Sequence, residues 1–452
     1  MIAMLAKAKR LLLFLGLTLL AIQHISVGNA SELAHGSLAV DAEAEAVIQG
    51  WLDELAKAAD LRGHKIRPYF LISDEANAGA TVGSRVIIYT GLITKCQNVA
   101  QFLGVLAHEV GHIQGGHVAL ADSKSHRAQM PALAAIVLGG AATLATGDPS
   151  ALMAGIIGSQ HIYMSQMLRF SRSQEAASDQ AAATLTKKLG WDEAISGLSD
   201  FLKLLKNDNL SGGQINPYLR SHPPEEERFS ALETHISENR KHLPKQFEDN
   251  FQRIKAKFIA YLWHPNQALH RYPESDTSLT ARYARVVIYH RQGNTDKSLA
   301  LVRQLINEHP KDAYFHELEG QVLMETGQAD GAIAAYSRAL KLQPRADIIK
   351  LQLCHLLVDR GNQNDLKEAI PLLRQLIDRA ENISCWRLLA TAYGKAGQIG
   401  LASWALAEEA YDMEDFVSAK NHANRAAKQD LQDQRATSRV RDILAQVNEP
   451  KR

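Results

Sequence analysis

The stretch 108–112, HEVGH, has the residue types and spacing of a metal site that catalyses hydrolysis. His108 and His112 are four residues apart, so on a helix both rings lie on one face and can bind one metal ion. Glu109 lies beside them and can take a proton from metal-bound water. Imidazole favours zinc, which lowers the pKa of its bound water to about 7. Two solvated or core histidines can share this spacing by chance, but the position of the motif on a capped amphipathic helix favours zinc.

The third ligand distinguishes classes of zinc peptidase. The longer form of the motif needs a histidine at position 118, which is Val118; His117 is one residue away and off the metal face of a continuous helix, as a surface residue or a neighbour of the ligands. A glutamate from a second helix is the other solution. Glu175 and Asp179 share a helical face in the stretch EAASD, so we expect Glu175 to bind the metal and Asp179 to orient a ligand histidine. An ordinary exposed helix face would show the same pattern.

A third group of side chains follows in the stretch 222–228, HPPEEER. Its prolines favour a turn and then a helix start, where the glutamates are favourably placed. From there His222 and Arg228 can face the site, and an imidazole or a cation can stabilise the oxyanion of a tetrahedral intermediate. A loop histidine and a helix-surface arginine fit the spacing equally well.

Helices and a small sheet are expected to position these motifs. The sequence predicts a helix within 31–63, strands at 66–74 and 82–93, and a helical region over 164–206. The turn-rich stretch ANAGATVG between the two strands predicts that they form a hairpin. Asn98 and Gln101 have the spacing of a capping box at the start of the helix that carries the two histidines.

Beyond about residue 270 the sequence repeats. Gly293, Gly327 and Gly361 are 34 residues apart, and so are Pro310 and Pro344. A 34-residue period with helix–turn–helix texture is typical of tetratricopeptide repeats. Such helix pairs stack into an α-solenoid with a concave binding groove.

The composition is that of a multidomain globular protein, with 46% hydrophobic and 22% charged residues. The formal net charge of +1 argues against a strongly basic nucleic-acid binder. A basic start, an apolar run over 11–22 and small residues before Ser31 predict a cleavable signal peptide, since a membrane anchor needs about 20 apolar residues. We therefore expect a signal peptide at 1–30, a metallopeptidase domain at 31–265, a repeat domain at 270–430 and a charged, fraying tail at 431–452.

Two other features leave alternatives open. The chain has three cysteines, which are too few for a disulfide framework. One pairing, Cys354 with Cys385, stays possible if the compartment is oxidising. Residues 130–158 are apolar and rich in alanine and glycine. They are short for a membrane span, which favours tightly packed helices or an apolar flap over a membrane contact.

The motifs HEVGH, EAASD and HPPEEER, in this order and spacing, resemble the Ste-type and HtpX-type zinc metallopeptidases of the gluzincin class. With the signal peptide and the repeats, the chain resembles the periplasmic BepA-type members in particular. The resemblance implies a mainly α protein, in which an α+β gluzincin-type domain with a small β-sheet precedes an α-solenoid of tetratricopeptide repeats. It implies one Zn²⁺ per chain, with these roles: ligands His108, His112 and Glu175, general base Glu109, orienting residue Asp179, and transition-state residues His222 and Arg228.

The resemblance also implies a regulated site. In BepA-type members the residue matching His222 is described as lying on a loop that can cover or bind the zinc and keep the protease latent. The family's edge strand, which aligns substrate by strand addition, corresponds to the region 77–88 here.

By this resemblance the chain is an extracytoplasmic, periplasmic endopeptidase. It would cleave misfolded or stalled outer-membrane proteins, recruited by the repeats together with the outer-membrane assembly machinery, with no nucleic-acid partner and at most peripheral membrane contact. The alternative is a chaperone or assembly adaptor that works through the repeat groove while the metal site is latent. A prenyl-protease-like enzyme is disfavoured, because the sequence does not contain the multiple convincing membrane spans that such an enzyme needs.

Overall fold

The computed structural model describes residues 36–61, 63, 65–118, 172–212, 216–223, 226–379 and 383–448. The predicted signal peptide and the apolar stretch 130–158 lie outside these residues. The chain divides into two compact units between Asn294 and Thr295, and each is described by itself. The domain limits expected from the sequence stay a prediction.

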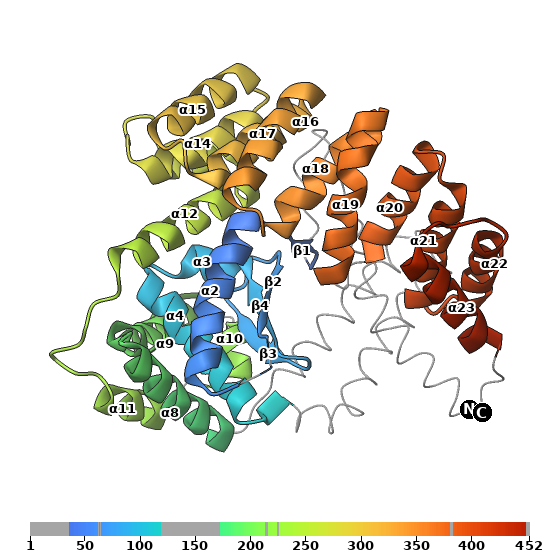
Figure 1. Ribbon diagram of the computed structural model, residues 1–452. Coiled ribbons are helices and arrows are strands. Elements are labelled where there is room, and N and C mark those ends of the chain that lie inside the picture. Colours follow the sequence, from blue (N-terminus) through green and yellow to red (C-terminus); the bar gives the residue numbers. More distant parts are fainter. Residues whose placement is uncertain are drawn as a thin grey trace, which may run out of the picture. The chain divides into compact units, whose positions relative to one another are not determined.

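The first unit combines a small sheet with helices that pack beside it (Figure 1). Its elements are β1 (Leu38–Ala39), α2 (Ala42–Ala58), β2 (Arg67–Leu71), β3 (Ala78–Thr81), β4 (Arg85–Tyr89), α3 (Thr90–Lys95), α4 (Val99–Gln114), α8 (Arg172–Leu189), α9 (Asp192–Gly212), α10 (Pro217–Ser221), α11 (Glu226–Thr234), α12 (Lys245–Leu262), α13 (Pro265–Arg271) and α14 (Leu279–Arg291).

The predicted hairpin between the two aromatic-rich strands is wrong. Those strands, β2 and β4, are neighbours but run parallel, and the sheet order is β1-β2-β4-β3. The partner of β4 in the hairpin is β3, whose sequence AGAT lies in the stretch expected to be a turn. Alanine and glycine are depleted in strands, so propensity gives no signal for β3. The hairpin turns at Gly83 and Ser84, where both φ angles are positive, as a tight primed turn requires.

Helix α4 lies at the centre of this unit and carries the first motif. It packs against α8 and α9, and every residue from Val99 to His112 is buried. Its start is the predicted one: Asn98 is the N-cap, and its side chain accepts a hydrogen bond from the backbone N–H of Gln101. The Gln101 side chain differs from the expected capping box, because it accepts the N–H of Gln97 instead of that of the N-cap.

Helix α14 belongs to the first unit although it lies within the predicted repeat range. The hydroxyl of Tyr283 donates to Oε2 of Glu43 in α2 at 2.8 Å. Arg253 from α12 pairs with the other oxygen of the same carboxylate at 2.7 Å. These buried polar contacts join the first helix of the unit to two helices that follow the HEVGH motif by more than a hundred residues.

The second unit is helical and contains the predicted repeats. Its helices are α15 (Thr295–Glu308), α16 (Ala313–Glu325), α17 (Ala329–Leu342), α18 (Asp347–Arg360), α19 (Gln363–Arg379), α20 (Ile383–Lys395), α21 (Ile399–Asp412), α22 (Phe416–Ala427) and α23 (Gln434–Asn448). Helices adjacent in the sequence pack on one another as pairs (Figure 1). The register glycines Gly327 and Gly361 have φ of 77° and 68°, so each takes the left-handed backbone that follows a helix. The predicted fold class is confirmed.

The expectation that the charged tail frays is wrong for most of its length. Residues Gln434–Asn448 form α23, and Val440 and Ile443 on it are buried. Arg439 holds the carboxylate of Glu408 in α21 with two hydrogen bonds of 2.8 and 2.7 Å. The high charge of this segment suggested a disordered tail. A few buried apolar residues are nevertheless enough to pack an amphipathic helix on its neighbours.

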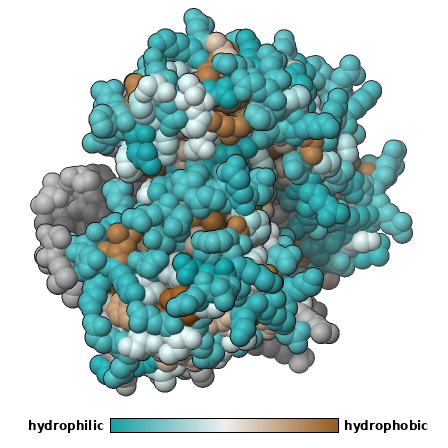
Figure 2. Space-filling view, turned by 90° about the vertical axis from the view of Figure 1, so that its left-hand side faces the viewer, coloured by the Kyte–Doolittle hydropathy of each residue, from teal (hydrophilic) through white to brown (hydrophobic). Residues whose placement is uncertain are grey.

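Figure 2 shows hydrophilic residues over most of the face it views, with small hydrophobic areas between them. The large apolar side chains exposed among the described residues are separated along the chain: Val40, Trp263, Leu342, Ile399, Met413 and Val417. Within the described part of the chain, none of the helices has the length and apolar character needed to cross a membrane. Cys354 and Cys385 are buried and reduced, so the disulfide considered for them is not formed here.

Candidate metal centre

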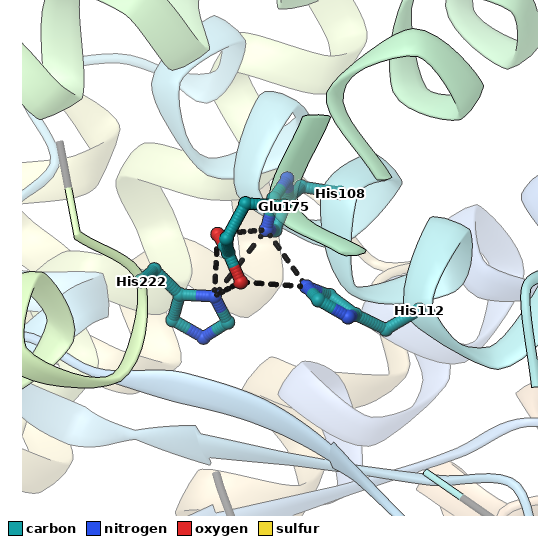
Figure 3. Close-up of side chains that lie close together, drawn as sticks. All are labelled: His108, His112, Glu175 and His222. Atoms are coloured by element: carbon teal, nitrogen blue, oxygen red, sulfur yellow. Dashed lines mark hydrogen bonds and ion pairs between the residues drawn. The ribbon is translucent and has the colours of Figure 1, made fainter. Parts of the chain in front are cut away.

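The side chains of His108, His112, Glu175 and His222 meet in one buried group (Figure 3). One ligand atom from each lies within 4.8 Å of those of the other three. The two histidines come from adjacent turns of α4, Glu175 from the first turn of α8, and His222 from the end of α10. Three segments distant in sequence therefore converge on one point.

The distances within the group are those of ligands around one small cation. Nε2 of His108 lies 3.1 Å from Nε2 of His112, and each nitrogen is 3.4 Å from an oxygen of Glu175. Two nitrogens that bind one zinc ion at 2.0–2.1 Å in tetrahedral geometry are roughly 3.3 Å apart. With Nδ1 of His108 beside the carboxylate of Asp179, the neutral ring keeps its proton at Nδ1, and Nε2 can then offer its lone pair to a cation. The residues present thus fit the metal that the sequence predicts.

His222 is closer to the candidate ligands than a substrate-binding residue needs to be. Its Nδ1 lies 3.0 Å from Oε1 of Glu175 and 3.4 Å from Nε2 of His108. Its Nε2 points to Glu109, whose Oε1 is 3.5 Å away. The ring of Tyr218 stacks on the His222 ring with centroids 4.5 Å apart, and both side chains are fully buried. In this arrangement His222 is placed to be a fourth ligand.

Asp179 and Arg228 surround the group with charge. Oδ1 of Asp179 lies 2.8 Å from Nδ1 of His108, as the sequence predicts for an orienting carboxylate. Arg228 donates from Nε and Nη2 to the two oxygens of Asp179, at 2.8 and 3.0 Å. Its Nη1 lies 2.9 Å from Oε2 of Glu175 and also donates to the carbonyl of Pro223. The guanidinium is therefore directed at the carboxylates rather than at open space.

The surrounding charges and burial give the two candidate ligand histidines different pKa values. Burial lowers the pKa of His108, but Asp179 and then Glu175 outweigh it and raise that pKa to about 10. Burial lowers the pKa of His112 to about 3, against a smaller opposing effect of Glu175. Burial raises the pKa of Glu175, but His222 and the hydrogen bonds of the other histidines lower it well below its usual value. The carboxylates thus favour positive charge at the centre of the group.

Glu109 is held by the sheet. Its Oε2 accepts a hydrogen bond of 2.9 Å from the backbone N–H of Ala80 in the edge strand β3. Its Oε1 has no hydrogen-bond partner among the described residues and lies on the side of His222. One carboxylate oxygen is therefore fixed by the backbone while the other faces the candidate metal site.

The structure also brings His117 and Ser178 to the site, neither of which the sequence assigned to it. Nδ1 of His117 lies 3.1 Å from Nδ1 of His112, and the side chain is buried, so its interpretation as a surface residue is wrong and its interpretation as a neighbour of the ligands agrees with the structure. Helical spacing does not apply to position 117, because α4 ends at Gln114. The Gly-Gly pair at 115–116 was the signal for this turn. The hydroxyl of Ser178, in the EAASD stretch, lies 3.3 Å from Nδ1 of His117.

Gly111 explains why the second motif lies so close to the first. A Cβ at this position would be 2.8 Å from the carbonyl oxygen of Ser178, closer than Cβ atoms come to backbone. The glycine within the motif therefore allows α8 to approach α4 at the level of the ligands. That approach is what brings Glu175 and Asp179 to the histidines.

Comparison with known proteins agrees with this arrangement. Residues 42–236 match the model of peptidase family M48, and residues 274–415 match that of the cytochrome c-type biogenesis protein H TPR domain. A beta-barrel assembly-enhancing protease of Yersinia pestis is 23% identical over 347 residues, which are 73% of this chain and 68% of that protein. The protein of the same name from Escherichia coli K12 is 24% identical over 334 residues, 72% of this chain and 66% of that one.

Two other matches are more limited, one in the share of this chain and one in structural similarity. The metalloprotease YcaL of Escherichia coli K12 is 29% identical over 190 residues, 41% of this chain and 69% of that protein. A solved TPR-domain structure aligns with 77% of this chain and 99% of its own length at 15% identity, but its TM-score of 0.17 is too low to carry an argument. The chain spans about two thirds of the length of the assembly-enhancing proteases it matches. The chain is therefore a metalloprotease whose residues 42–236 match peptidase family M48 and whose residues 274–415 match a domain of tetratricopeptide-like repeats, and the expected resemblance to BepA-type proteases is confirmed.

Proposed function

We propose that this chain is a periplasmic zinc endopeptidase that acts on unfolded or misassembled outer-membrane β-barrel proteins. The observation that carries the proposal is the convergence of His108, His112 and Glu175 on one point beside the carboxylate of Glu109. In the proposal these three residues hold one zinc ion per chain. When bound, zinc supplies Lewis acidity to the scissile carbonyl and to the attacking water.

The side chains around the candidate metal have separate proposed roles in catalysis and positioning. Glu109 takes a proton from the attacking water at Oε1 and passes it to the leaving amine, while its Oε2 stays bound to Ala80. Asp179 holds the proton of His108 at Nδ1, so that Nε2 remains a ligand atom. Because Arg228 is directed at Asp179 and Glu175, we assign it the positioning of those carboxylates instead of the oxyanion contact expected from the sequence.

His222 has two proposed positions. In the arrangement seen here its Nδ1 joins the ligand group, and His108, Glu109, His112 and His222 are all fully buried. A substrate carbonyl needs that space, so His222 must move away before cleavage. Once displaced, its imidazole can donate a hydrogen bond to the developing oxyanion. The buried state therefore represents a resting, closed form of the enzyme.

The substrate and the compartment are proposed from the relatives. The name of the two assembly-enhancing proteases connects a protease to β-barrel assembly. A signal peptide at 1–30 would deliver the chain to the periplasm, where unfolded β-barrel proteins pass. The repeats in 270–430 would bind these substrates or the outer-membrane assembly machinery, because stacked helix pairs present an extended binding surface.

The buried state of His222 favours a second candidate function. A chain whose metal site stays closed would act mainly as a chaperone or assembly adaptor through its repeats. The two functions depend on different parts of the chain. The adaptor function needs only the repeats, whereas the protease function also needs a metal centre that can open to substrate.

The experiment that tests the proposal compares substrates. The purified full chain is incubated with a urea-unfolded outer-membrane β-barrel protein or with unfolded casein, with zinc, with a chelator, and with the chelator followed by excess zinc. We expect cleavage of the β-barrel protein that the chelator stops and zinc restores, and weaker cleavage of casein. Binding of the β-barrel protein without cleavage in any condition would favour the adaptor.

A further inference from the structure

The two ring nitrogens of His112 face two different groups. Nε2 lies 3.1 Å from Nε2 of His108, on the side of the candidate metal. Nδ1 lies 3.1 Å from Nδ1 of His117 on the opposite side of the ring. His108 has an equivalent contact, because its Nδ1 lies 2.8 Å from Asp179. Each α4 histidine in the candidate ligand set thus has a polar neighbour at Nδ1, but the neighbour of His112 is an imidazole rather than a carboxylate.

The backbone after α4 is shaped to return His117 to the helix. Gly115 closes the helix with an N–H bond of 2.9 Å to the carbonyl of Gly111. Gly116 follows with φ of +65°, a conformation that strains other residues. A Cβ on Gly115 would lie 2.5 Å from Nε2 and 2.7 Å from Cε1 of His117. The space for the His117 ring therefore exists only because position 115 has no side chain.

The His117 ring is enclosed on its other side as well. It is 8% exposed, and Oγ of the fully buried Ser178 lies 3.3 Å from its Nδ1. Ser178 belongs to α8, between Glu175 and Asp179 in the sequence. Helix α8 thus supplies the candidate ligand Glu175 and also contacts His117, the neighbour of His112.

We propose that His117 is a positioning residue for the metal: its Nδ1 accepts the Nδ1–H of His112 and fixes the tautomer and the orientation in which Nε2 of His112 binds the metal. Hydrogen bonds to the second nitrogen of a ligand histidine have this effect in metal sites generally. The inference rests on the proposed function in one respect, because it takes His112 as a metal ligand. Gly115, Gly116 and His117 then extend the metal site beyond the HEVGH motif.

The test measures zinc affinity, by competition of the purified full chain with a fluorescent zinc chelator. His117→Phe keeps a ring but removes the acceptor, and we expect zinc to bind about 10- to 100-fold more weakly. His117→Asn places a carbonyl oxygen where Nδ1 was, so we expect most of the affinity to return. His117→Gln moves its amide to the position of Nε2 and should resemble the Phe variant. A residue needed only for packing would favour Phe over Asn.

A second pair of variants tests the role of the glycine. Gly115→Ala should displace the His117 ring and weaken zinc binding. In a His117→Ala background the same alanine meets no ring, so there it should change the zinc affinity little. Gly50→Ala is the control, because Gly50 lies in α2 and has nothing within 4 Å of its Cβ position. Circular dichroism of each variant shows whether the fold is retained.

The outcomes separate this inference from the proposed function. If the unsubstituted chain binds no zinc, the proposed function and this inference both fail. If the unsubstituted chain binds zinc and His117→Phe binds it equally well, the inference alone is overturned. An Asn variant as weak as the Phe variant, with its fold intact, would also overturn it, since the restored acceptor would then have no effect.

Discussion

Nδ1 of the ligand candidate His108 lies 2.8 Å from Oδ1 of Asp179, and the same carboxylate receives two hydrogen bonds from Arg228. The histidine is thereby fixed through a carboxylate that is itself fixed by a guanidinium. Because all three side chains are buried, the arrangement cannot exchange its partners for water without opening the domain. The orientation of His108 is therefore a property of the fold.

Asp179→Asn should weaken metal binding while keeping the shape of the site. The amide oxygen can still accept the Nδ1–H of His108, but the charge that favours a cation is lost. We expect zinc affinity to fall about 10- to 100-fold, measured by chelator competition. Asp200→Asn, at an exposed position of α9, is the control and should bind zinc normally. Equal affinity of the two variants would contradict an orienting role for Asp179.

Arg228→Met should destabilise the protein strongly, because Glu175 and Asp179 would remain buried without their cation. Removing one partner of a buried ion pair costs about 3–5 kcal/mol. Arg228→Lys should recover little of this, since an ammonium group cannot donate to both oxygens of Asp179 in the fork geometry. Urea unfolding of the full chain measures the loss, with the exposed Arg220→Met as control. A loss no greater than the control's would show that the guanidinium contributes little.

Ala80→Pro should reduce cleavage without removing the metal. Proline deletes the N–H that holds Oε2 of Glu109. In β3, an edge strand, this N–H points away from β4, so the pairing of the strands is kept. We expect kcat to fall about 10- to 100-fold, since small displacements of a catalytic group have effects of this size. Ala80→Ser, which keeps the N–H, is the control. Normal cleavage by the proline variant would mean that the contact with β3 does not position Glu109.

The cysteines of the second unit should be unreactive in the folded protein. Burial raises the pKa of Cys354 and that of Cys385 to about 12, with a smaller contribution to Cys354 from Cys385. An unfolded cysteine has a pKa of about 8.5. The folded state therefore favours the thiol. Its stability from these groups is full below about pH 8.5 and is lost as the pH rises towards 12.

Alkylation with iodoacetamide measures this difference. At pH 8 the native chain should incorporate little reagent at Cys354 and Cys385, whereas the chain in urea should be modified at both. Mass spectrometry without reductant should give the mass of two thiols. Rapid modification of the native chain, or a mass lower by two hydrogens, would contradict the buried, reduced state.

The sequence predicted the candidate ligands better than it predicted their surroundings. His108, Glu109 and His112 lie on one helix, where spacing determines which side chains meet, and Glu175 and Asp179 follow the same rule on a second helix. The contact of Ala80 with Glu109 could not be predicted, because it uses a backbone group of a strand made of small residues. The position of His117 beside the ligands was only one of two interpretations, because helical spacing was applied beyond the turn at 115–116.

The remaining differences also have physical causes. Which strands of a small sheet are neighbours depends on contacts between distant segments, so the parallel pairing of β2 and β4 could not be read from either strand alone. The direction of Arg228 was open for a similar reason. An arginine near a metal site can face substrate or a carboxylate, and only the fold shows that Asp179 and Glu175 lie within reach of this one.

The most direct test of the account is the cleavage of an unfolded outer-membrane β-barrel protein by the full chain and by its Glu109→Gln variant. Zinc content is measured on the same samples. The amide keeps the size of the side chain but cannot take a proton from water, so the variant should bind one zinc ion per chain and cleave at least about 100-fold more slowly. Equal cleavage by the two proteins, at equal zinc content, would contradict the assignment of Glu109 as the general base.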